Sequence, residues 1–266
     1  MSDVIVYLAA RRQHASSSTP LEHPAGVALP IDVPAGAAQI TRNILGEIRS
    51  GTYGADVVRR LPDAVMPGDR VLLIGAGLGV VSTLVARADG VERVIAVEPN
   101  SALFPHIDRV HAFNGVSEIE TINAMPAVGK KGKIELCTQH DPRTSLFMPH
   151  GRSWQPAQMV PFIDLNMILA EERISLIICD TPSVPAQLLT EAELAQVDRI
   201  LLTCGSDVAR CWDGDGACMQ LVARGYTPEP SGTAILLRRS VARRSCSTGF
   251  STPANLNFAP GLANLG

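Results

Sequence analysis

One stretch of this chain limits its possible folds more than any other. Residues 71–100 read VLLIGAGLGVVSTLVARADGVERVIAVEPN. An apolar strand runs into a loop with three glycines, a helical segment follows, and a second apolar strand ends at Glu98. Such alternation is typical of βαβ units, in which parallel strands build a buried sheet. The stretch therefore predicts a parallel sheet with a ligand-binding loop after one of its strands.

The alternation continues along the chain and predicts the rest of the fold. Before the loop, apolar residues at helical spacing predict two short helices broken at Ser50 and Gly51. After it, we expect helices at 80–88, about 102–113, 164–173 and 188–195, and a last helix that ends near 225. We expect strands at 93–97, 118–123, 132–139, 174–180, 199–205 and 233–239. This order indicates an α/β fold with a doubly wound, mostly parallel sheet and helices on both faces.

Composition indicates one globular domain between two looser ends. Of the 266 residues, 46% are hydrophobic and 18% are charged, as in ordinary soluble domains. We expect a flexible leader at 1–25 and an α/β domain at 26–240, with a helical cap at about 36–66. Residues 241–266 lack periodicity and are rich in Gly, Pro, Ser and Asn, so we expect a disordered tail.

Charge and hydropathy exclude several classes of partner. A net charge of -3 and an aromatic content of 4% argue against nucleic acid. No apolar run reaches the roughly 18 residues that a membrane helix needs. The arginines follow the first apolar patch, whereas a secretory signal has its positive charges before it, so we expect a cytoplasmic protein. Cys204, Cys211 and Cys218 lie two helical turns apart, about 10 Å, too far for two thiolates to share one zinc ion, and we expect no metal.

The spacing of the loop glycines separates two kinds of cofactor. Dinucleotide-binding loops follow the pattern G-x-G-x-x-G, whose third glycine lets the helix approach the strand closely. Here Gly75, Ala76 and Gly77 fit, but the extra glycine is Gly79 and the third position holds Val80. A branched side chain at that position disfavours NAD. S-adenosylmethionine carries no phosphate and needs only a sharply bent loop beneath its ribose and methionine, so the spacing favours this cofactor.

The ends of the next two strands supply further candidate cofactor contacts. Glu98, followed by Pro99, can accept hydrogen bonds from both ribose hydroxyls, although NAD enzymes place an acid similarly. Asn123 ends the following strand, and with Met125 it should face the same crevice. An amide and an apolar neighbour suit an adenine ring. The alternative is that Asn123 only caps its strand.

Several motifs together resemble a known family. They read SGTYGADVVRRLP, PGDRVLLIGAGLGVVSTLVA, RVIAVEPN, NGV, INAM and DLNMILAEERISLIICD. Over residues 51–202 the chain resembles the FkbM family of S-adenosylmethionine-dependent methyltransferases. The resemblance implies O-methylation of a hydroxyl on a small molecule, a sugar or a related glycan.

Two positions depart from the pattern of this class. Methyltransferases usually carry an acid two residues before the first glycine, where it helps to hold the amino group of the cofactor. That position is Leu73, and the loss of a carboxylate there should weaken binding unless Asp69 or another group compensates. The family pattern D-x-E-G-x-E after the fourth strand keeps Asp180 but has Pro182 and Pro185 in place of the glutamates.

Two residues are candidates for the chemistry itself. Methyl transfer to a hydroxyl requires the acceptor to be held in line with the methyl group, and in some cases a base. Asp180 ends a strand on the side of the predicted crevice and can orient or deprotonate the acceptor, and His140 is a second candidate base. Alternatively, Asp180 bonds the amides of the following turn and His140 is a surface residue.

Three functions remain open on the sequence. The first is a methyltransferase that acts on a hydroxyl. The second is a methyltransferase-like fold that has lost catalysis and serves as a binding or scaffolding protein, which Leu73 and the two prolines favour. The third is an NAD-dependent oxidoreductase, which Val80 disfavours.

Overall fold

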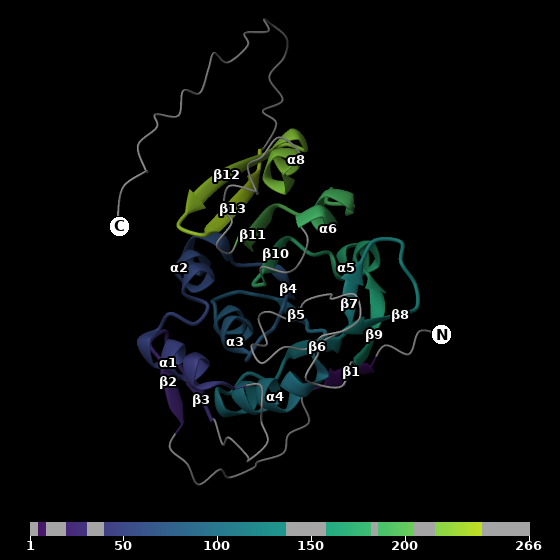
Figure 1. The fold of residues 1–266 in the computed structure, drawn as a ribbon. Coiled ribbons are helices and arrows are strands. Elements are labelled where there is room, and N and C mark those ends of the chain that lie inside the picture. The colour runs from purple at the N-terminus through teal and green to yellow at the C-terminus, as the bar shows by residue number, and fades with distance from the viewer. Residues whose placement is uncertain are drawn as a thin grey trace, which may run out of the picture.

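The computed structural model describes residues 5–8, 20–30, 40–136, 158–181, 186–204 and 216–240 (Figure 1). Within these ranges the core is an eight-stranded sheet in the order β1-β6-β5-β4-β10-β11-β13-β12. Five adjacent strands are parallel: β6 (Ile119–Asn123), β5 (Arg93–Val97), β4 (Arg70–Ile74), β10 (Leu176–Cys179) and β11 (Arg199–Thr203). β1 (Ile5–Leu8) is antiparallel to β6, and β13 (Ala234–Arg239) is antiparallel to both β11 and β12 (Tyr226–Ser231). The predicted mostly parallel sheet is confirmed.

The chain winds outward from β4 in two directions. It proceeds from β4 through β5 to β6 on one side, and then returns to add β10 and β11 on the other. The order therefore reverses between β4 and β10, and the crevice at such a reversal is where open α/β sheets bind ligands. Beyond β11 the antiparallel β13 lies between β11 and β12, so the sheet departs from the 3-2-1-4-5-6 order of dinucleotide-binding domains.

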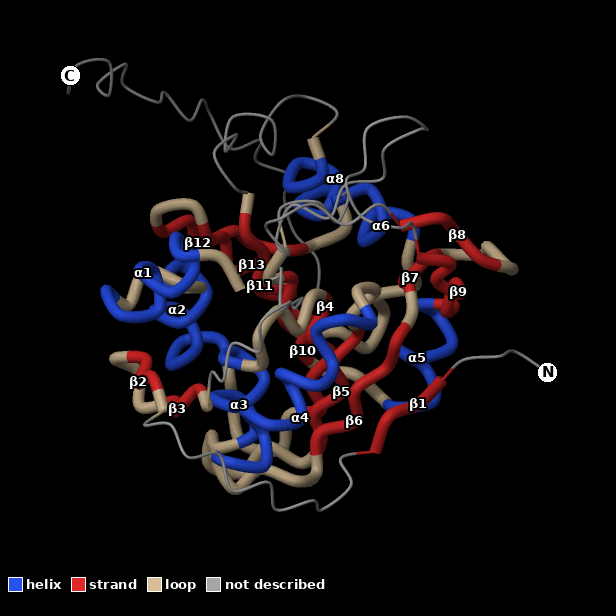
Figure 2. Tube along the Cα trace, turned by 60° about the horizontal axis from the view of Figure 1, so that its bottom comes forward, coloured by secondary structure: helices blue, strands red, loops and turns tan. Residues whose placement is uncertain are grey.

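Helices cover both faces of the sheet (Figure 2). One face packs against α1 (Arg42–Ser50), α2 (Ala55–Ala64), α3 (Val80–Ala86) and α4 (Phe104–Phe113). The other packs against α5 (Leu165–Glu172), α6 (Ala186–Glu191) and α8 (Ala217–Ala223). Each face of the sheet has its own hydrophobic core, and alternate residues of β4 point into one or the other. Val71 and Leu73 face the core with α1 to α4, and Leu72 and Ile74 face the core with α5, α6 and α8. Burial on both faces explains why the strands are continuously apolar.

The N-terminal region has more regular structure than the sequence indicates. The two helices of the predicted cap are α1 and α2, and Gly51 ends α1 in the left-handed conformation (φ 73°). However, β1 and β2 (Leu21–His23) fall within the expected leader, and β2 pairs with β3 (Val27–Leu29). These strands are too short for a periodic signal; β1 is held by pairing with β6, far along the chain, and β2 by its hairpin with β3.

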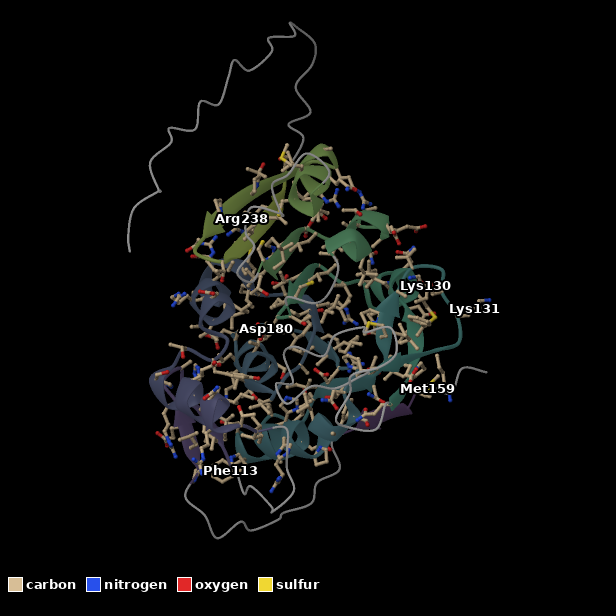
Figure 3. The ribbon with its side chains drawn as sticks, in the orientation of Figure 1. Phe113, Lys130, Lys131, Met159, Asp180 and Arg238 are labelled. Carbon is tan, nitrogen blue, oxygen red and sulfur yellow. The ribbon has the colours of Figure 1, made fainter. Side chains whose placement is uncertain are left out.

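A smaller sheet extends from the end of β6 and has the order β7-β9-β8. Its strands are β7 (Met125–Ala127), β8 (Lys133–Leu136) and β9 (Gln158–Asp164). The strand expected at 132–139 is therefore present, but in this second sheet. Lys130, Lys131 and Met159 lie at its outer side, away from the large sheet (Figure 3).

The predicted second half of the fold is largely confirmed, with two strands missed, β9 and β12. Asp164 caps α5, since its side chain accepts a hydrogen bond from Asn166 N at 3.1 Å. β12 contains Pro228 and Pro230, which argue against a strand in the sequence. Among the described residues, no helix is long and apolar enough to cross a membrane and no cluster of His, Cys, Asp or Glu could hold a metal ion. Residues 241–266 and Cys211 lie outside the described residues.

Candidate functional site

The glycine loop after β4 has the conformation that its sequence requires. Gly75, Gly77 and Gly79 have φ angles of 88°, 54° and 85°, a region that other residues rarely adopt. Packing imposes a second constraint. A Cβ atom at Gly75 would lie 3.1 Å from the side chain of Thr181, and one at Gly77 would lie 2.8 Å from the Tyr53 hydroxyl. The loop is therefore closely covered by segments from elsewhere in the chain.

All five N–H groups of the loop are used within the protein. Gly75 N donates to Val97 O at 2.9 Å, and Gly79 N donates to Ala76 O at 2.9 Å. The amides of Ala76 and Gly77 bond the Glu98 carboxylate. The fifth amide, Leu78 N, donates to the Tyr53 hydroxyl at 3.1 Å. The loop thus presents no N–H group of its own to a bound anion.

Glu98 is a buried carboxylate at the end of β5. Its Oε2 accepts from Gly77 N at 3.1 Å and its Oε1 accepts from Asn100 N at 2.8 Å. No cation pairs with it among the described residues. Burial raises the pKa of Glu98 to about 7, although the backbone amides of Asn100, Gly77 and Ala76 act in the opposite direction. A carboxylate in this environment has a high free energy when charged, and further hydrogen bonds from a ligand would stabilise it.

Asn123 lies beside Glu98 and ties β6 to the turn after β5. Its Nδ2 donates to Glu98 O at 2.9 Å and to Pro99 O at 3.0 Å. Both amide hydrogens are therefore used within the protein, as the capping alternative requires, and Oδ1 is the atom with which Asn123 could contact a base. Met125 is buried and packs with Leu136 and Val160 in the core of the small sheet.

Asp180 follows β10, at the same edge of the sheet as Glu98 and Asn123 (Figure 3). Its backbone N donates to Ile74 O at 3.1 Å, which holds the end of β10 against the end of β4. The side chain is half-buried, and its Oδ2 lies 3.8 Å from the position of a Cβ at Gly54. Asp180 thus lies between the glycine loop and the start of α2. His140 lies outside the described residues.

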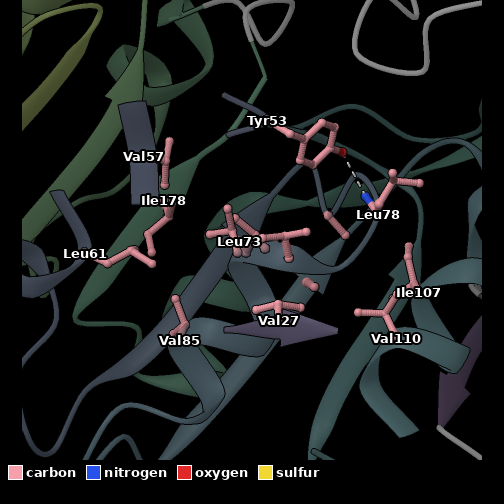
Figure 4. Packing of buried hydrophobic residues seen from close by; sticks show 14 of the residues in the cluster. Val27, Tyr53, Val57, Leu61, Leu73, Leu78, Val85, Ile107, Val110 and Ile178 are labelled. Carbon is pink, nitrogen blue, oxygen red and sulfur yellow. Dashed lines mark hydrogen bonds between the residues drawn. The ribbon is translucent and has the colours of Figure 1, made fainter. Parts of the chain in front are cut away.

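Tyr53 connects the helical cap to the glycine loop. It lies between α1 and α2, it is buried, and its hydroxyl reaches the loop at Leu78 (Figure 4). The Tyr53 carbonyl is 3.1 Å from His23 Nε2, which belongs to β2. Tyr53 lies within the motif SGTYGADVVRRLP, but a lone tyrosine between two helices does not by itself predict a contact with the loop.

Two more buried polar residues border the site. Asn100 Oδ1 accepts from Ala102 N at 3.1 Å, whereas Asn100 Nδ2 has no partner among the described residues. His111 Nε2 is 2.8 Å from Ser82 Oγ, and burial lowers the pKa of His111 to about 4. Because Ser82 Oγ donates to Gly79 O, it accepts the hydrogen of Nε2, and His111 is neutral. Such contacts depend on packing across the fold, which no sequence pattern reveals.

The position two residues before the first glycine holds no acid, and Asp69 does not replace one. Leu73 is fully buried in the apolar core. Asp69 precedes β4, so it lies at the opposite end of that strand from the loop. There it pairs with Arg199 through contacts of 2.6 and 3.1 Å, and Ser175 Oγ donates to it at 2.7 Å. The possibility that Asp69 compensates for Leu73 is therefore wrong.

The polar groups follow the strand order across one edge of the sheet. Asn123 lies at β6, Glu98 at β5, the glycine loop and Tyr53 at β4, and Asp180 at β10. An elongated ligand laid along this edge would meet an amide, then a carboxylate, then a close-packed loop, and last a second carboxylate. The structure brings together the predicted glycines, Glu98, Pro99, Asn123 and Asp180, and adds Tyr53 and Asn100 to them.

Comparison with known proteins shows no family for this chain. No protein-family model matches the chain, and no curated protein matches it. A solved ribosomal protein L11 methylase from Lactobacillus delbrueckii subsp. bulgaricus is 12% identical, with a TM-score of 0.42 over 71% of this chain and 79% of the other. A putative tRNA methyltransferase from Streptococcus pneumoniae, in complex with S-adenosyl-L-methionine, is 13% identical, with a TM-score of 0.39 over 68% and 72%.

Proposed function

We propose that this chain is an S-adenosylmethionine-dependent methyltransferase of the FkbM type that transfers a methyl group to a hydroxyl of a small molecule or sugar. The observation that carries the proposal is the buried carboxylate of Glu98 at the end of β5, beside which the described residues place no cation. A carboxylate offers about four acceptor positions. The amides of Ala76, Gly77 and Asn100 occupy three of them, which leaves one for a ribose hydroxyl.

The other polar groups fit the same cofactor in part. Asn100 Nδ2 is a buried donor without a described partner two residues from Glu98, and Asn123 Oδ1 can accept from the edge of an adenine. S-adenosylmethionine supplies the reactive methyl group when bound. The residues of the chain hold the ribose, exclude water from the loop and, at Asp180, orient the acceptor hydroxyl or take its proton.

NAD fits this loop less well. A pyrophosphate is normally bound by N–H groups of the loop and the helix that follows it. Here every N–H group of residues 75–79 is already donated within the protein. Val80 is buried in the core at the position of the third dinucleotide glycine. Both features favour a cofactor without phosphate.

Binding calorimetry with S-adenosylmethionine, S-adenosylhomocysteine and NAD tests the proposal. We expect heat with the two sulfur compounds and none with NAD. Glu98→Gln should weaken S-adenosylhomocysteine binding about tenfold to hundredfold, because the single side-chain oxygen of glutamine cannot accept from a ribose hydroxyl and three backbone amides together. Folded protein that binds neither sulfur compound would contradict the proposal.

A second function has support from one specific position. Leu73, fully buried, cannot contact the amino group of a cofactor, and a methyltransferase-like protein without catalysis would tolerate this loss. Methyl transfer to a panel of hydroxylated small molecules and sugars, with a protein and a tRNA as further acceptors, separates the two functions. Cofactor binding without transfer to any acceptor would favour a binding or scaffolding role.

A further inference from the structure

We infer that the turn between β7 and β8 binds acidic groups of the methyl acceptor, and that this acceptor is an elongated oligosaccharide or related glycan with carboxylate, sulfate or phosphate groups. The turn comprises residues 129–133, with the sequence GKKGK, and is called the lysine turn below. The inference rests on the proposed function and names the class of acceptor for that same site.

Every lysine of the chain lies in this turn. The lysines are Lys130, Lys131 and Lys133, and all three are exposed. Lys130 and Lys131 lie at the outer side of the small sheet (Figure 3). A Cβ atom at Gly129 or Gly132 would meet no atom of the described residues within 4 Å. The turn therefore presents its positive charges to open space.

The arginines of the described ranges are mostly occupied within the protein. They donate to its own carboxylates or carbonyls, as shown by Arg59, Arg60, Arg70, Arg87, Arg93, Arg109, Arg199, Arg224, Arg238 and Arg239. The lysines differ, because their one contact among the described residues is that of Lys130 Nζ with the Phe162 ring, 6.0 Å from its centroid. Cations without a polar partner are thus concentrated in the lysine turn.

The carboxylates of the small sheet leave the lysine turn positive. Its three strands contain two of them, Glu135 and Asp164. Asp164 accepts from Asn166 N as the N-cap of α5, and Glu135 lies opposite Met159, further along β8 from the turn. The whole chain has a net charge of -3, which repels a long polyanion such as a nucleic acid. A local positive turn on such a chain suits a ligand with a few acidic groups.

The small sheet holds the lysine turn at a fixed distance from the cofactor edge. Gln158, the first residue of β9, accepts from Ser101 N at 3.2 Å and from Ser101 Oγ at 2.9 Å, close in sequence to Glu98. Lys133 pairs with Pro161, three residues further along β9, which is about 10 Å from Gln158. Asp180 lies at the opposite side of this edge, beyond β5 and β4. An acceptor that reaches both the turn and Asp180 must therefore be longer than a single sugar ring.

The chemistry of lysine suits such an acceptor. An ammonium group has three donors on a flexible stem and acts as a point charge, whereas the planar guanidinium of arginine matches one fixed carboxylate. Acidic groups along an oligosaccharide are presented in several orientations, and each can form a charge-assisted hydrogen bond with an ammonium group. The lysine turn would then select the acceptor, while Asp180 holds its hydroxyl.

Methyl transfer to matched oligosaccharides tests the inference. Tetragalacturonate and neutral galactotetraose differ in the carboxylate of each ring, and sulfated and phosphorylated oligosaccharides complete the acidic set. We expect transfer to an acidic oligosaccharide with kcat/KM at least about tenfold above that of its neutral counterpart. Replacing the lysines together, by Lys130→Gln, Lys131→Gln and Lys133→Gln, should raise the KM of that acceptor about tenfold to hundredfold and leave kcat unchanged. Equal use of the neutral counterpart, or an unchanged KM in this variant, would overturn the inference.

Two further variants separate charge at this turn from charge in general. Changing the same three lysines to arginine keeps the charge and should keep the KM within about threefold. Arg42→Gln, Arg49→Gln and Arg59→Gln together remove an equal charge from exposed positions of α1 and α2, and this variant should behave as the native protein. A rise in KM as large as that of the lysine variant would show that only net charge matters, which would overturn the inference.

Acetylation of the native protein locates the contact directly. Because every lysine lies in the turn, the extent of lysine acetylation by an N-hydroxysuccinimide ester, read by mass spectrometry, reports on this turn alone. The acidic oligosaccharide that is methylated should protect the lysines, and its neutral counterpart should not. Equal protection by tetraglutamate would assign the turn to an acidic polypeptide and overturn the inference.

The proposed function and the inference fail in different ways. Native protein that binds S-adenosylhomocysteine but transfers methyl groups to no acidic oligosaccharide would overturn the inference alone. Native protein that binds neither S-adenosylmethionine nor S-adenosylhomocysteine would instead contradict the proposed function.

Discussion

The two ends of the parallel sheet treat a buried carboxylate in opposite ways. At the amino end, Asp69 is paired with Arg199 through two contacts and receives further hydrogen bonds from Ser175 Oγ and Met66 N. At the carboxyl end, Glu98 is also buried, but its partners within the described part of the chain are backbone amides alone. The charge of Asp69 is balanced inside the protein by a cation and by hydrogen bonds, as expected of a carboxylate with a structural role. Glu98 has acceptor capacity that only a ligand would use.

The largest effect on stability should come from removing the cation that pairs with Asp69. Arg199→Ala leaves Asp69 charged and buried without its cation, and the loss of a buried partner costs about 3–5 kcal/mol of unfolding free energy. Urea denaturation followed by circular dichroism measures the loss. Arg59→Ala is the control, because Arg59 is exposed and its ion pair with Asp56 on α2 should contribute less than about 1 kcal/mol. Losses of equal size would mean that the Asp69 pair is not the structural anchor described above.

Glu98, at the carboxyl end of the sheet, should make the stability of the protein depend on pH. The pKa of Glu98 is raised from 4.5 to about 7 in the folded protein, so the folded state binds more protons than the unfolded state between these values. The contribution of Glu98 to stability is therefore complete below pH 4.5 and is lost as the pH rises through 7. Between pH 5 and pH 8 the loss should reach about 2–3 kcal/mol.

Glu98→Gln removes this ionisation and serves as the reference. Urea denaturation of both proteins at pH 5 and pH 8 gives the difference directly, because the titration of His111 and of other groups is common to both. Native protein should lose about 2–3 kcal/mol more than the variant between the two pH values. Parallel pH profiles would indicate that Glu98 is stabilised in the folded state as well as Asp69 is.

The sequence predicted the sheet because its strands carry continuous apolar runs that need no distant information. β4, β5 and β10 each appear as such a run, and the glycines after β4 mark the loop. β1, β2 and β12 were not found: β1 is held by pairing with β6, far away in the chain, whereas β2 and β12 belong to short hairpins without a clear apolar alternation. In β12 the two prolines even argue against a strand, but it is an edge strand and tolerates them.

The candidate site was predicted only where a residue lies at the end of a strand. Glu98, Asn123 and Asp180 share that property, and it brings them to one edge of the sheet. Tyr53 could not be found in this way, because its place at the loop depends on how α1 and α2 pack on the sheet. The sequence also could not decide whether Asp69 replaces the acid missing at Leu73, since that depends on its pairing with Arg199.

The smallest effect on stability should come from a substitution of Asn123, which lies at the carboxyl end of the sheet. Asn123→Ala removes two hydrogen bonds, to Glu98 O and Pro99 O, and should cost about 1–2 kcal/mol of unfolding free energy. If Oδ1 also accepts from the adenine amino group, the native protein should prefer adenosine to inosine, whose ring lacks that group. Calorimetry with both nucleosides should show this preference disappear in the variant. A preference that survives in Asn123→Ala would assign Asn123 to the strand end alone.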